Sequence, residues 1–496
     1  MEKITPSAYQ EKIFDFVEQD YRNLIVNAVP GSGKTTTVIM ALKLAYGKTL
    51  AAAFNKAIET ELSAKAPKHA KVKTLNALGH GLLCRKYNYV KINKNKFYNS
   101  VKAYEDESSE KIPFKMVKPL KEFFEKTRAY GFGISIDMTD ENLNEYFDFF
   151  QIDLDPQENE DFDILKTFFL KAYQGIFKEH IGNESEFDFG DQVYIPVYRK
   201  IDAWKYDNIF IDEAQDISPL QLLLIQKFSH STTRSYFVGD RFQSIYAFRG
   251  ADHNSMDTIK KLFDCVELPL SISYRCPNKV LGILSQYTPD IEGKPGNIEG
   301  EVDNLLFTEE MAFPKDSLIL CRTNAPLVKV GASLLARGQD VSLNNNELRD
   351  KLLNFIAGCK TTKMNRILEL AKSDHERWLS VGKIRKDAWF QVLESQEVYQ
   401  SLQSFYDISD TVADLKDNIS KMFTYKIGCI QLLTVHKAKG LESDNVYIIN
   451  DELFSKFGNT DKEKIQEDNC RYVALSRSKK NLTFLTVNIK DGNSGK

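Results

Sequence analysis

The chain has 496 residues, of which 42% are hydrophobic and 27% are charged, and its net charge is only −3. This length exceeds the roughly 250–300 residues at which a single core stops growing, so two to four domains are expected. The small net charge excludes a basic field over the whole surface, and any contact with nucleic acid must therefore be local.

The cysteines and the apolar runs exclude several classes of protein. Seven cysteines form no CxxC pair and seven histidines are scattered, which argues against a zinc ribbon or an iron–sulfur cluster. No run reaches the ~18 apolar residues of a membrane span, and the N-terminus lacks the apolar core of a signal peptide. We expect a cytoplasmic protein without a membrane contact.

Short apolar runs followed by turn signals predict two sets of strands. The first set has the sequences RNLIVNAV, TLAAAF, NIFIDE and RSYFVGD, and the second has SLILCR, IQLLTVH, NVYIIND and NLTFLTV. Nearly continuous apolar strands separated by helical stretches indicate parallel sheets that are covered on both faces. The sequence therefore predicts two α/β domains.

A glycine-rich loop follows the first predicted strand and precedes a helix. In this context backbone N–H groups bind phosphates, with Lys34 on the β- and γ-phosphates and Thr35 on Mg²⁺. A glycine-rich loop without a ligand is the alternative. The residues predicted to contact the nucleotide are Ala28, Pro30, Gly31, Ser32, Gly33, Lys34, Thr35 and Thr36.

Stretches of unusual charge interrupt both sets of strands. Residues 85–128 hold 12 Lys and Arg against 6 Asp and Glu, whereas residues 137–163 hold 11 acids and no base. Residues 349–386 hold 10 bases against 4 acids. A solvated helical surface explains such runs as well as a binding face does. We interpret the two regions as insertions, one in each domain.

Two carboxylates end the third apolar strand, at Asp212 and Glu213. Asp212 can bind Mg²⁺ directly or through water, and Glu213 can orient and deprotonate an attacking water. A solvated strand end is the alternative, but a chain with a phosphate loop favours the catalytic interpretation.

The segment GDRFQSIYAFRG, residues 239–250, places a glutamine, two aromatic residues and an arginine in one short element. Gln243 is positioned to contact the γ-phosphate, and the aromatic residues could stack on bases. Hydrolysis also needs cations on the γ-phosphoryl oxygens, for which Arg275 and Arg477 are candidates. A surface salt bridge is the alternative for each arginine. The combination predicts a motor that couples ATP hydrolysis to nucleic acid.

The motifs and their order along the chain resemble those of the UvrD/Rep/PcrA family of superfamily 1 DNA helicases, and the chain resembles a compact variant of that family. The similar segments are AVPGSGKTT, LAAAFNKA, TLNALGHGLL, IFIDEAQD, VGDRFQSIYAFRGA, LSISYRCP, IQLLTVHKAKGLE and YVALSRSKK. The resemblance implies two RecA-like parallel-sheet P-loop motor domains with ATP between them, each interrupted by a mostly helical insertion. The first domain would comprise residues 1–84 and 186–264, with an insertion at 85–185. The second would comprise residues 265–344 and 426–496, with a short insertion at 345–425.

The resemblance also implies roles for individual residues. Gln10 and Tyr274 would contact adenine, Glu442 would contact the ribose or nearby groups, and Arg275 and Arg477 would act as arginine fingers. Single-stranded DNA would contact Phe54, Asn55, Thr74, Tyr246, Phe248, Arg249, Thr434 and His436. Aromatic stacking suits a motor that ignores sequence, because every base has a π-face. A core position remains the alternative for the phenylalanines, and a structural role has equal weight for His436.

The chain departs from the family pattern at several places, among them one motif that is a residue shorter and a Leu-Ser-Arg-Ser in place of Val-Thr-Arg-Ala. Phe248 replaces a tryptophan, Leu75 and Asn76 replace a Phe-His pair, and the second insertion is shorter than usual. We expect an ATP- and Mg²⁺-dependent translocase on single-stranded DNA and a 3′–5′ helicase in replication, repair or recombination. It would act as a monomer on single strands and on single-strand/duplex junctions, and a protein loading partner is allowed. The alternatives are a translocase that does not unwind, an ATP-gated accessory protein and an RNA motor.

Overall fold

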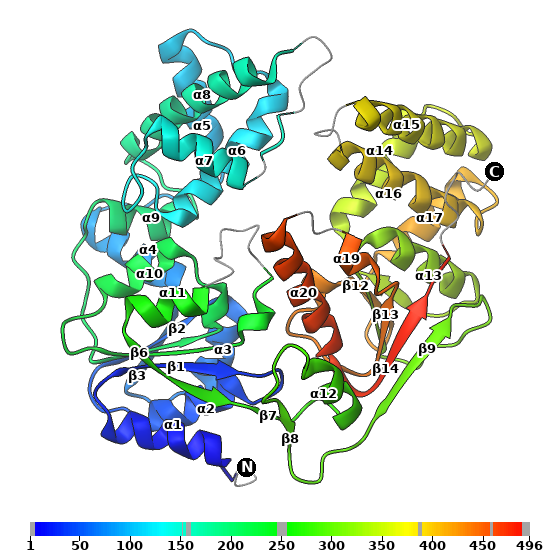
Figure 1. Ribbon diagram of the computed structural model, residues 1–496. Helices are drawn as coiled ribbons and strands as arrows, with labels where there is room; N and C mark the ends of the chain where they lie inside the picture. The colour runs from blue at the N-terminus through cyan, green and yellow to red at the C-terminus, as the bar shows by residue number, and fades with distance from the viewer. Residues whose placement is uncertain are drawn as a thin grey trace. The chain divides into compact units, whose positions relative to one another are not determined.

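The computed structural model describes residues 5–150, 152–154, 160–245, 255–384, 389–456 and 460–488. The chain forms two compact units, Met1–Ser271 and Ile272–Lys496, and each is described by itself (Figure 1). None of the described helices is long and apolar enough to cross a lipid bilayer.

The first unit is built on a parallel sheet. Its described strands are β1 (Asn23–Ala28), β2 (Thr49–Ala53), β3 (Ala70–Thr74), β4 (Asn208–Asp212), β5 (Arg234–Gly239) and β6 (Cys265–Leu270). They pair in the order β3-β2-β4-β5-β1-β6, and every pair is parallel. All carboxyl ends of the strands therefore lie at one edge of the sheet.

Alternate strand residues pack against helices on opposite faces of this sheet. Leu24 and Val26 share a core with helices α1, α2 and α3, whereas Ile25 belongs to the core on the other face. This pattern explains why the strands are apolar at nearly every position. The helices of the motor part are α1 (Ala8–Gln19), α2 (Lys34–Leu44), α3 (Lys56–Lys65), α4 (Leu75–Lys86), α9 (Asp191–Tyr198), α10 (Pro219–Lys227) and α11 (Ser255–Leu262).

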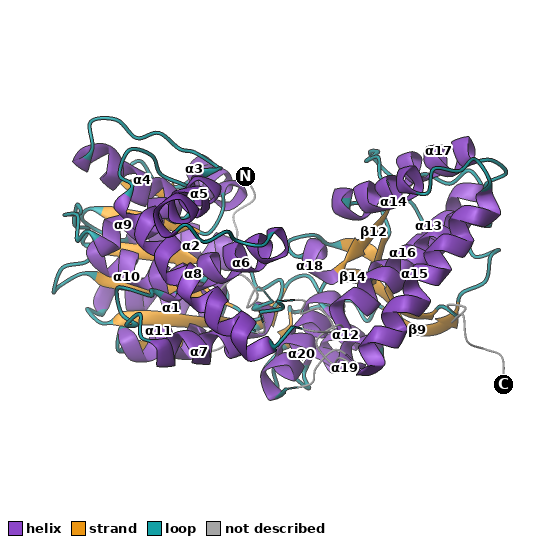
Figure 2. Ribbon diagram, turned by 90° about the horizontal axis from the view of Figure 1, so that it is seen from above, coloured by secondary structure: helices purple, strands orange, loops and turns teal. Residues whose placement is uncertain are grey.

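A helical insertion separates β3 and α4 from β4. It comprises α5 (Lys96–Ser108), α6 (Phe114–Tyr130), α7 (Asp140–Phe149) and α8 (Phe162–Gly182), and Figure 2 shows it as helices and loops. Its centre is aromatic, with the Phe123 ring 4.8 Å from Tyr173 and 5.7 Å from Phe169. Such a core explains how a segment with so many surface charges folds.

The second unit contains another parallel sheet. Its strands are β9 (Glu301–Leu306), β10 (Leu318–Cys321), β11 (Val341–Leu343), β12 (Ile430–Thr434), β13 (Ser443–Ile449) and β14 (Ser478–Thr486). In the described residues they pair in the order β11-β12-β10-β13-β14-β9. The short strands β7 (Ile272–Ser273) and β8 (Glu292–Gly293) pair separately. The prediction of an α/β fold with two parallel sheets is confirmed.

The second insertion is part of the core of the second unit. It comprises α14 (Asn346–Gly358), α15 (Met364–Ile384), α16 (Trp389–Tyr406) and α17 (Val412–Met422). Leu402 and Phe405 of α16 are buried in one cluster with the strand residues Ile319 and Leu432. The remaining helices are α12 (Asn278–Leu284), α13 (Asn324–Ala336), α18 (Val435–Ala438), α19 (Leu453–Lys456) and α20 (Asp461–Leu475).

The predicted start of the second domain at Cys265 is too early. Residues Cys265–Leu270 form β6, which pairs with β1 at the edge of the first sheet. The chain divides after Ser271. This strand contains Glu267 and Pro269, which an edge position tolerates and a central strand does not, so its sequence lacks the apolar run of the other strands.

Candidate functional site

The phosphate loop joins β1 to α2 with two glycines in the left-handed region. Gly31 has φ of +69° and Gly33 has φ of +79°, values that side-chain-bearing residues rarely adopt. Helix α2 begins at Lys34, and no side chain caps its first turn. Ser32 is fully buried and its Oγ has no hydrogen-bond partner among the described residues. These donors fit a bound phosphate group.

Gln10 lies beneath this loop. Its Nε2 donates to Thr37 Oγ1 at 3.0 Å, and Thr37 Oγ1 donates in turn to the Gly33 carbonyl at 3.0 Å. Gln10 Oε1 also accepts from the Ser7 amide at 2.9 Å, within the capping box of α1. The predicted adenine contact stays a prediction, while the observed contacts connect α1 to the phosphate loop.

Thr35 and Asp212 are in direct contact although 177 positions separate them in the sequence. Thr35 Oγ1 donates to Asp212 Oδ2 at 2.8 Å. Burial raises the pKa of Asp212 to about 7, assisted by the neighbouring Glu213 carboxylate and opposed by the Thr35 hydrogen bond. A buried carboxylate beside a hydroxyl offers two oxygen ligands of the kind that Mg²⁺ prefers. The pair predicted to bind the metal is therefore brought together.

Glu213 has a backbone conformation that is unusual for its type. Its φ is +56°, and its amide donates to Oδ1 of the neighbouring Asp212 at 3.0 Å. A non-glycine residue in the left-handed region costs on the order of 1 kcal/mol or more and persists only where the surroundings hold it. Such strain is concentrated at functional sites and fits the catalytic role predicted for this residue.

Gln215 is a buried residue of this site that the sequence analysis did not single out. Its Nε2 donates to Glu213 Oε2, and its Oε1 accepts from the Asp240 amide at 3.0 Å. Its carbonyl accepts from Ser244 Oγ at 3.2 Å. The side chain thus joins the carboxylates after β4 to the loop after β5. A glutamine two residues after an Asp-Glu pair is the only sequence signal for it.

Gln243 belongs to the same loop. Its Nε2 donates to Asp240 Oδ2 at 2.8 Å, and both residues are buried. Burial raises the pKa of Asp240 to about 6, opposed by the Lys34 charge. The loop thus lies within electrostatic range of the phosphate loop. The predicted DNA contacts Tyr246, Phe248 and Arg249 lie outside the described residues.

The ends of β2 and β3 bring three other predicted DNA contacts to the same edge of the sheet. Ala53, which precedes Phe54, pairs with Thr74 across the two strands. Asn55 caps α3 by accepting from the Ile58 amide at 3.0 Å, and Thr74 caps α4 by accepting from the Ala77 amide at 3.1 Å. Phe54, Asn55 and Thr74 therefore lie close together, because the paired strands β2 and β3 end there.

The altered pair Leu75 and Asn76 has a structural explanation. Leu75 is buried in the core, and Asn76 Nδ2 donates to the Phe189 carbonyl at 3.1 Å. The Phe189 side chain is 68% exposed beside these residues. An exposed aromatic residue thus lies close to the position at which this chain lacks the Phe-His pair of the family pattern. Sequence analysis missed Phe189, which only its exposure distinguishes.

Four predicted nucleotide contacts lie in the second unit. Arg275 Nε donates to Glu442 Oε2 at 2.6 Å, and the Tyr274 side chain is exposed. Arg477 is buried, with Nε donating to the Val473 carbonyl at 2.9 Å. Arg275 and Glu442 are therefore brought together. The roles of Arg275 and Arg477 as arginine fingers stay predictions.

Thr434 and His436 line a groove in the second unit. The groove has a volume of about 840 Å³ and lies at the carboxyl ends of β10, β12, β13 and β14. His436 Nε2 is 3.6 Å from Cys470 Sγ. Both predicted DNA contacts are half-buried and reach this groove.

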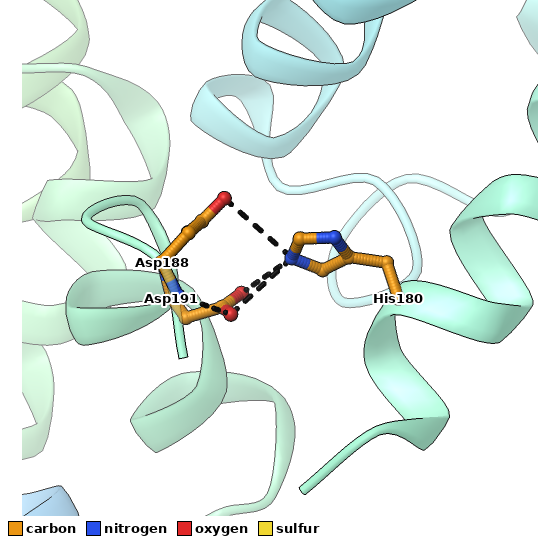
Figure 3. Close-up of side chains that lie close together, drawn as sticks. All are labelled: His180, Asp188 and Asp191. Atoms are coloured by element: carbon orange, nitrogen blue, oxygen red, sulfur yellow. Dashed lines mark hydrogen bonds and ion pairs between the residues drawn. The ribbon is translucent and has the colours of Figure 1, made fainter. Parts of the chain in front are cut away.

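His180, Asp188 and Asp191 form a compact group in the first unit whose ligand atoms all lie within 4.8 Å (Figure 3). The two carboxylates already have cationic hydrogen-bond partners within the protein. Arg128 Nη1 donates to Asp191 Oδ1 at 2.9 Å, and Lys96 Nζ donates to Asp191 Oδ2 at 2.8 Å. These cations repel a metal ion, and the group is a buried salt-bridge cluster.

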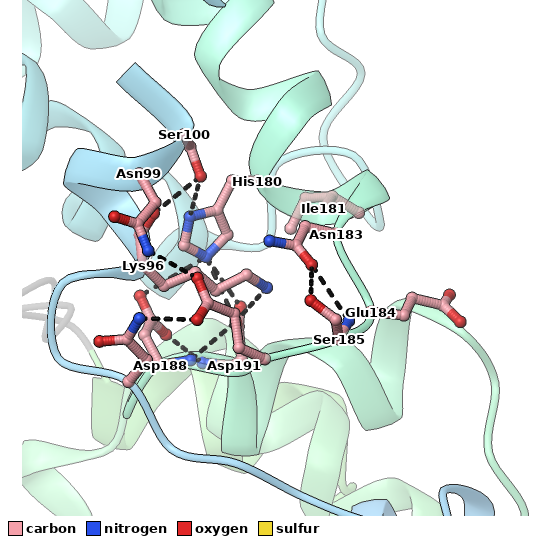
Figure 4. A network of polar contacts seen from close by, with 12 residues as sticks. Lys96, Asn99, Ser100, His180, Ile181, Asn183, Glu184, Ser185, Asp188 and Asp191 are labelled. Carbon is pink, nitrogen blue, oxygen red and sulfur yellow. Dashed lines mark hydrogen bonds and ion pairs between the residues drawn. The ribbon is translucent and has the colours of Figure 1, made fainter. Parts of the chain in front are cut away.

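The cluster joins the insertion to the motor part of the first unit (Figure 4). Lys96 comes from α5, Arg128 from α6 and His180 from α8, whereas Asp191 begins α9. Helix α9 packs so closely on α4 that a Cβ at Gly79 would lie 1.8 Å from the Gln192 carbonyl oxygen. The cluster therefore fixes α9, which packs against α4, the helix that Thr74 caps.

Comparisons with known proteins agree with these motifs. The model of the UvrD/REP helicase N-terminal domain matches residues 10–264, and that of the UvrD-like helicase C-terminal domain matches residues 359–488. The probable DNA helicase II homolog of Mycoplasma pneumoniae is 24% identical over 476 residues, which are 73% of this chain and 66% of that protein.

Two other relatives are matched over shorter regions. F-box DNA helicase protein 1 of Schizosaccharomyces pombe is 28% identical over 56% of this chain and 34% of its own length. ATP-dependent DNA helicase Rep of Buchnera aphidicola is 26% identical over 52% of this chain and 40% of its own length. The chain thus spans between one third and two thirds of these relatives. The N-terminal model alone covers more than half of the chain, which confirms the resemblance: the chain belongs to the UvrD/REP helicase family.

Proposed function

We propose that the chain is an ATP-dependent DNA helicase that translocates on single-stranded DNA and unwinds duplex DNA in the 3′–5′ direction. The contact of Thr35 with Asp212 carries the proposal, because it joins the phosphate loop to the carboxylates that hydrolysis needs. Its setting in a chain of the UvrD/REP helicase family supports DNA as the polymer.

The chemistry is assigned to residues at the carboxyl edge of the first sheet. Lys34 neutralises the β- and γ-phosphates, while Thr35 and Asp212 hold Mg²⁺. Bound Mg²⁺ stabilises the negative charge that develops on the phosphoryl oxygens. Glu213 orients the attacking water and accepts its proton. Gln243 contacts the γ-phosphate. When hydrolysis removes the γ-phosphate, the loss of this contact changes the segment that precedes Tyr246 in the sequence.

The DNA strand is proposed to cross the ends of β2 and β3, where Phe54, Asn55 and Thr74 lie together. Phe189 adds an exposed ring for stacking on a base, and such stacking contributes about 1–3 kcal/mol per base. Thr434 and His436 would contact the strand on the second unit. Replication, repair and recombination are the processes that such a motor serves.

Steady-state ATP hydrolysis with and without polymers tests this proposal. We expect stimulation by single-stranded DNA that exceeds the stimulation by RNA, and displacement of a strand from a duplex with a 3′ tail. Displacement from a 5′-tailed duplex alone would contradict the polarity. A rate that is the same without polymer, with DNA and with RNA would contradict the motor.

A translocase that does not unwind is the second candidate. It is favoured by one observation, the packing of α14–α17 into the core of the second unit, where Leu402 and Phe405 are buried with strand residues. An insertion held in this way is not a separate domain that could move independently onto a duplex. Stimulation by single-stranded DNA without displacement of any tailed duplex would support this candidate.

A further inference from the structure

We propose that helix α16 forms one wall of a single-strand-binding groove on the second unit, and that Gln396 and Gln400 contact the bound DNA strand. This inference rests on the proposed function, since it extends the strand past Thr434 and His436. It assigns a binding role to the short second insertion.

One face of α16 is directed at the groove. Leu393, Gln396, Glu397 and Gln400 all line it, together with Thr434 and His436. The spacing of i, i+3, i+4 and i+7 places these four side chains on a single stripe of the helix. Gln396 and Gln400 are half-buried and line the groove.

Helix α16 is held rigidly in this position. Its buried face supplies Tyr399, Leu402 and Phe405 to the core of the second unit. On the groove side, Glu397 Oε1 accepts from Asn324 Nδ2 at 2.8 Å and from the Asn324 amide at 3.3 Å. Asn324 Oδ1 accepts from Asn345 Nδ2 at 3.1 Å. A wall fixed by packing and by these hydrogen bonds is preorganised for binding.

The charge of the groove indicates which part of a strand it contacts. Four basic and four acidic side chains line it, so the charges balance. Lys351 Nζ lies 2.6 Å from Glu394 Oε1, and Arg322 Nε donates to Glu467 Oε2 at 2.6 Å. Two of the four cations are neutralised in this way, and Lys437 Nζ donates to the Asn344 carbonyl. With its lining charges balanced, the groove is a poor phosphate site.

Amide side chains suit the uncharged parts of a strand. Each glutamine offers two N–H donors and a carbonyl acceptor, which can meet the edge of any base or a sugar oxygen. The proposed ligand is therefore a single strand with unstacked bases, bound through bases and sugars. The phosphates face away from this wall, and the contact depends little on salt.

The test compares three forms of the full chain. The double variant Gln396→Ala/Gln400→Ala is compared with wild type and with Gln403→Ala, a half-buried glutamine of the same helix that lies outside the groove. Binding of a labelled single-stranded oligodeoxynucleotide of mixed sequence is measured at several salt concentrations, together with the basal ATPase rate and the melting temperature.

The double variant is expected to bind the oligonucleotide about 5–30-fold more weakly, as expected for the loss of two ordinary hydrogen bonds. The salt dependence of its affinity should match that of wild type. Gln403→Ala should bind within about twofold of wild type.

Unchanged binding by the double variant, or an equal loss in Gln403→Ala, would overturn the inference. A lower salt slope in the double variant would also overturn it, because the contacts would then be to phosphates. Failure of wild type to bind any single strand would instead refute the proposed function. The two failures are therefore distinguishable.

Discussion

Glu213 and Gln215 show how single residues prepare the nucleotide site. The strained backbone of Glu213 is held by a hydrogen bond to Asp212, and Gln215 binds the Glu213 carboxylate directly. Gln215 also holds the Asp240 amide, at the start of the loop that contains Gln243. One buried amide thus links the proposed catalytic base to the proposed γ-phosphate sensor.

Replacement of Gln215 by leucine should disturb this link. The change removes the side-chain acceptor of the buried Asp240 amide and one donor to the Glu213 carboxylate, at a cost of about 1–3 kcal/mol. We expect the DNA-stimulated ATPase rate to fall about tenfold or more, with nucleotide affinity within about threefold of wild type. Gln226→Leu, on the half-buried face of α10, is the control. A DNA-stimulated ATPase rate near that of wild type in Gln215→Leu would show that the hydrogen bonds of Gln215 support the structure and not catalysis.

Replacement of Glu213 by glutamine tests the proposed base. The amide keeps the shape of the side chain and its place in the strained turn, but it cannot accept a proton from water. Loss of general base catalysis should lower kcat by about 10²–10⁴-fold. Binding of ATP and of single-stranded DNA should remain within a few-fold of wild type. Hydrolysis at a near-normal rate would exclude Glu213 as the base.

The residues of the nucleotide site are more predictable than their partners. Lys34, Thr35, Asp212 and Glu213 are visible in the sequence because the phosphate loop and the carboxylates each follow an apolar strand. Gln215 is not, because its role depends on hydrogen bonds to a loop that is distant in the sequence. Phe189 likewise acquires its exposed place from the fold of the surrounding loop.

At the scale of elements, the salt-bridge cluster ties four helices of the first unit together. Its members Lys96, His180 and Asp191 are fully buried, and Arg128 is nearly so. Buried pairs of this kind add little net stability, but the removal of one partner costs about 3–5 kcal/mol. The cluster therefore fixes the insertion relative to α9.

The cluster predicts a pH dependence of stability. Burial lowers the pKa of His180, helped by the charges of Arg128 and Lys96 and opposed by the hydrogen bond to Asp191. Asp188 is the other charged group that faces it. The folded state therefore binds fewer protons than the unfolded state below the ordinary histidine pKa of about 6.5, and stability falls as pH falls from there.

His180→Gln should remove this part of the dependence. The free energy of unfolding in urea should decline less steeply between about pH 7 and about pH 5 than in wild type, by up to about 1.4 kcal/mol per pH unit. His69→Gln, at an exposed position of the same unit, is the control for the loss of a histidine. Equal slopes in wild type and His180→Gln would contradict the assignment.

Edge strands were harder to predict than central ones. The central strands β1, β4, β5, β10, β12 and β13 are buried at most positions and have continuous apolar sequences. Strands β3 and β9, at the ends of their sheets, are largely half-buried or exposed and have polar sequences. A strand with one partner and a solvated face needs few apolar residues. The fold class was therefore predictable, but the sheet edges were not.

At the scale of the whole molecule, two parallel sheets carry insertions that pack into the cores of their units. The aromatic residues of the first insertion belong to one buried cluster with strand residues of the first sheet, and the salt-bridge cluster also ties this insertion to the motor part. The second shares the core of its sheet and lines the groove beside Thr434. We infer that the second insertion serves strand binding more than duplex contact.

The central claim is that the phosphate loop of the first unit drives a motor on single-stranded DNA. The most direct test measures ATP hydrolysis by wild type and Lys34→Ala with and without single-stranded DNA, and DNA binding by both. The account predicts strong stimulation of wild type by DNA, and about a hundredfold or greater loss of turnover in Lys34→Ala. Lys34→Ala should bind single-stranded DNA nearly as well as wild type. Equal loss of hydrolysis and DNA binding in Lys34→Ala, or a wild-type rate indifferent to DNA, would contradict the account.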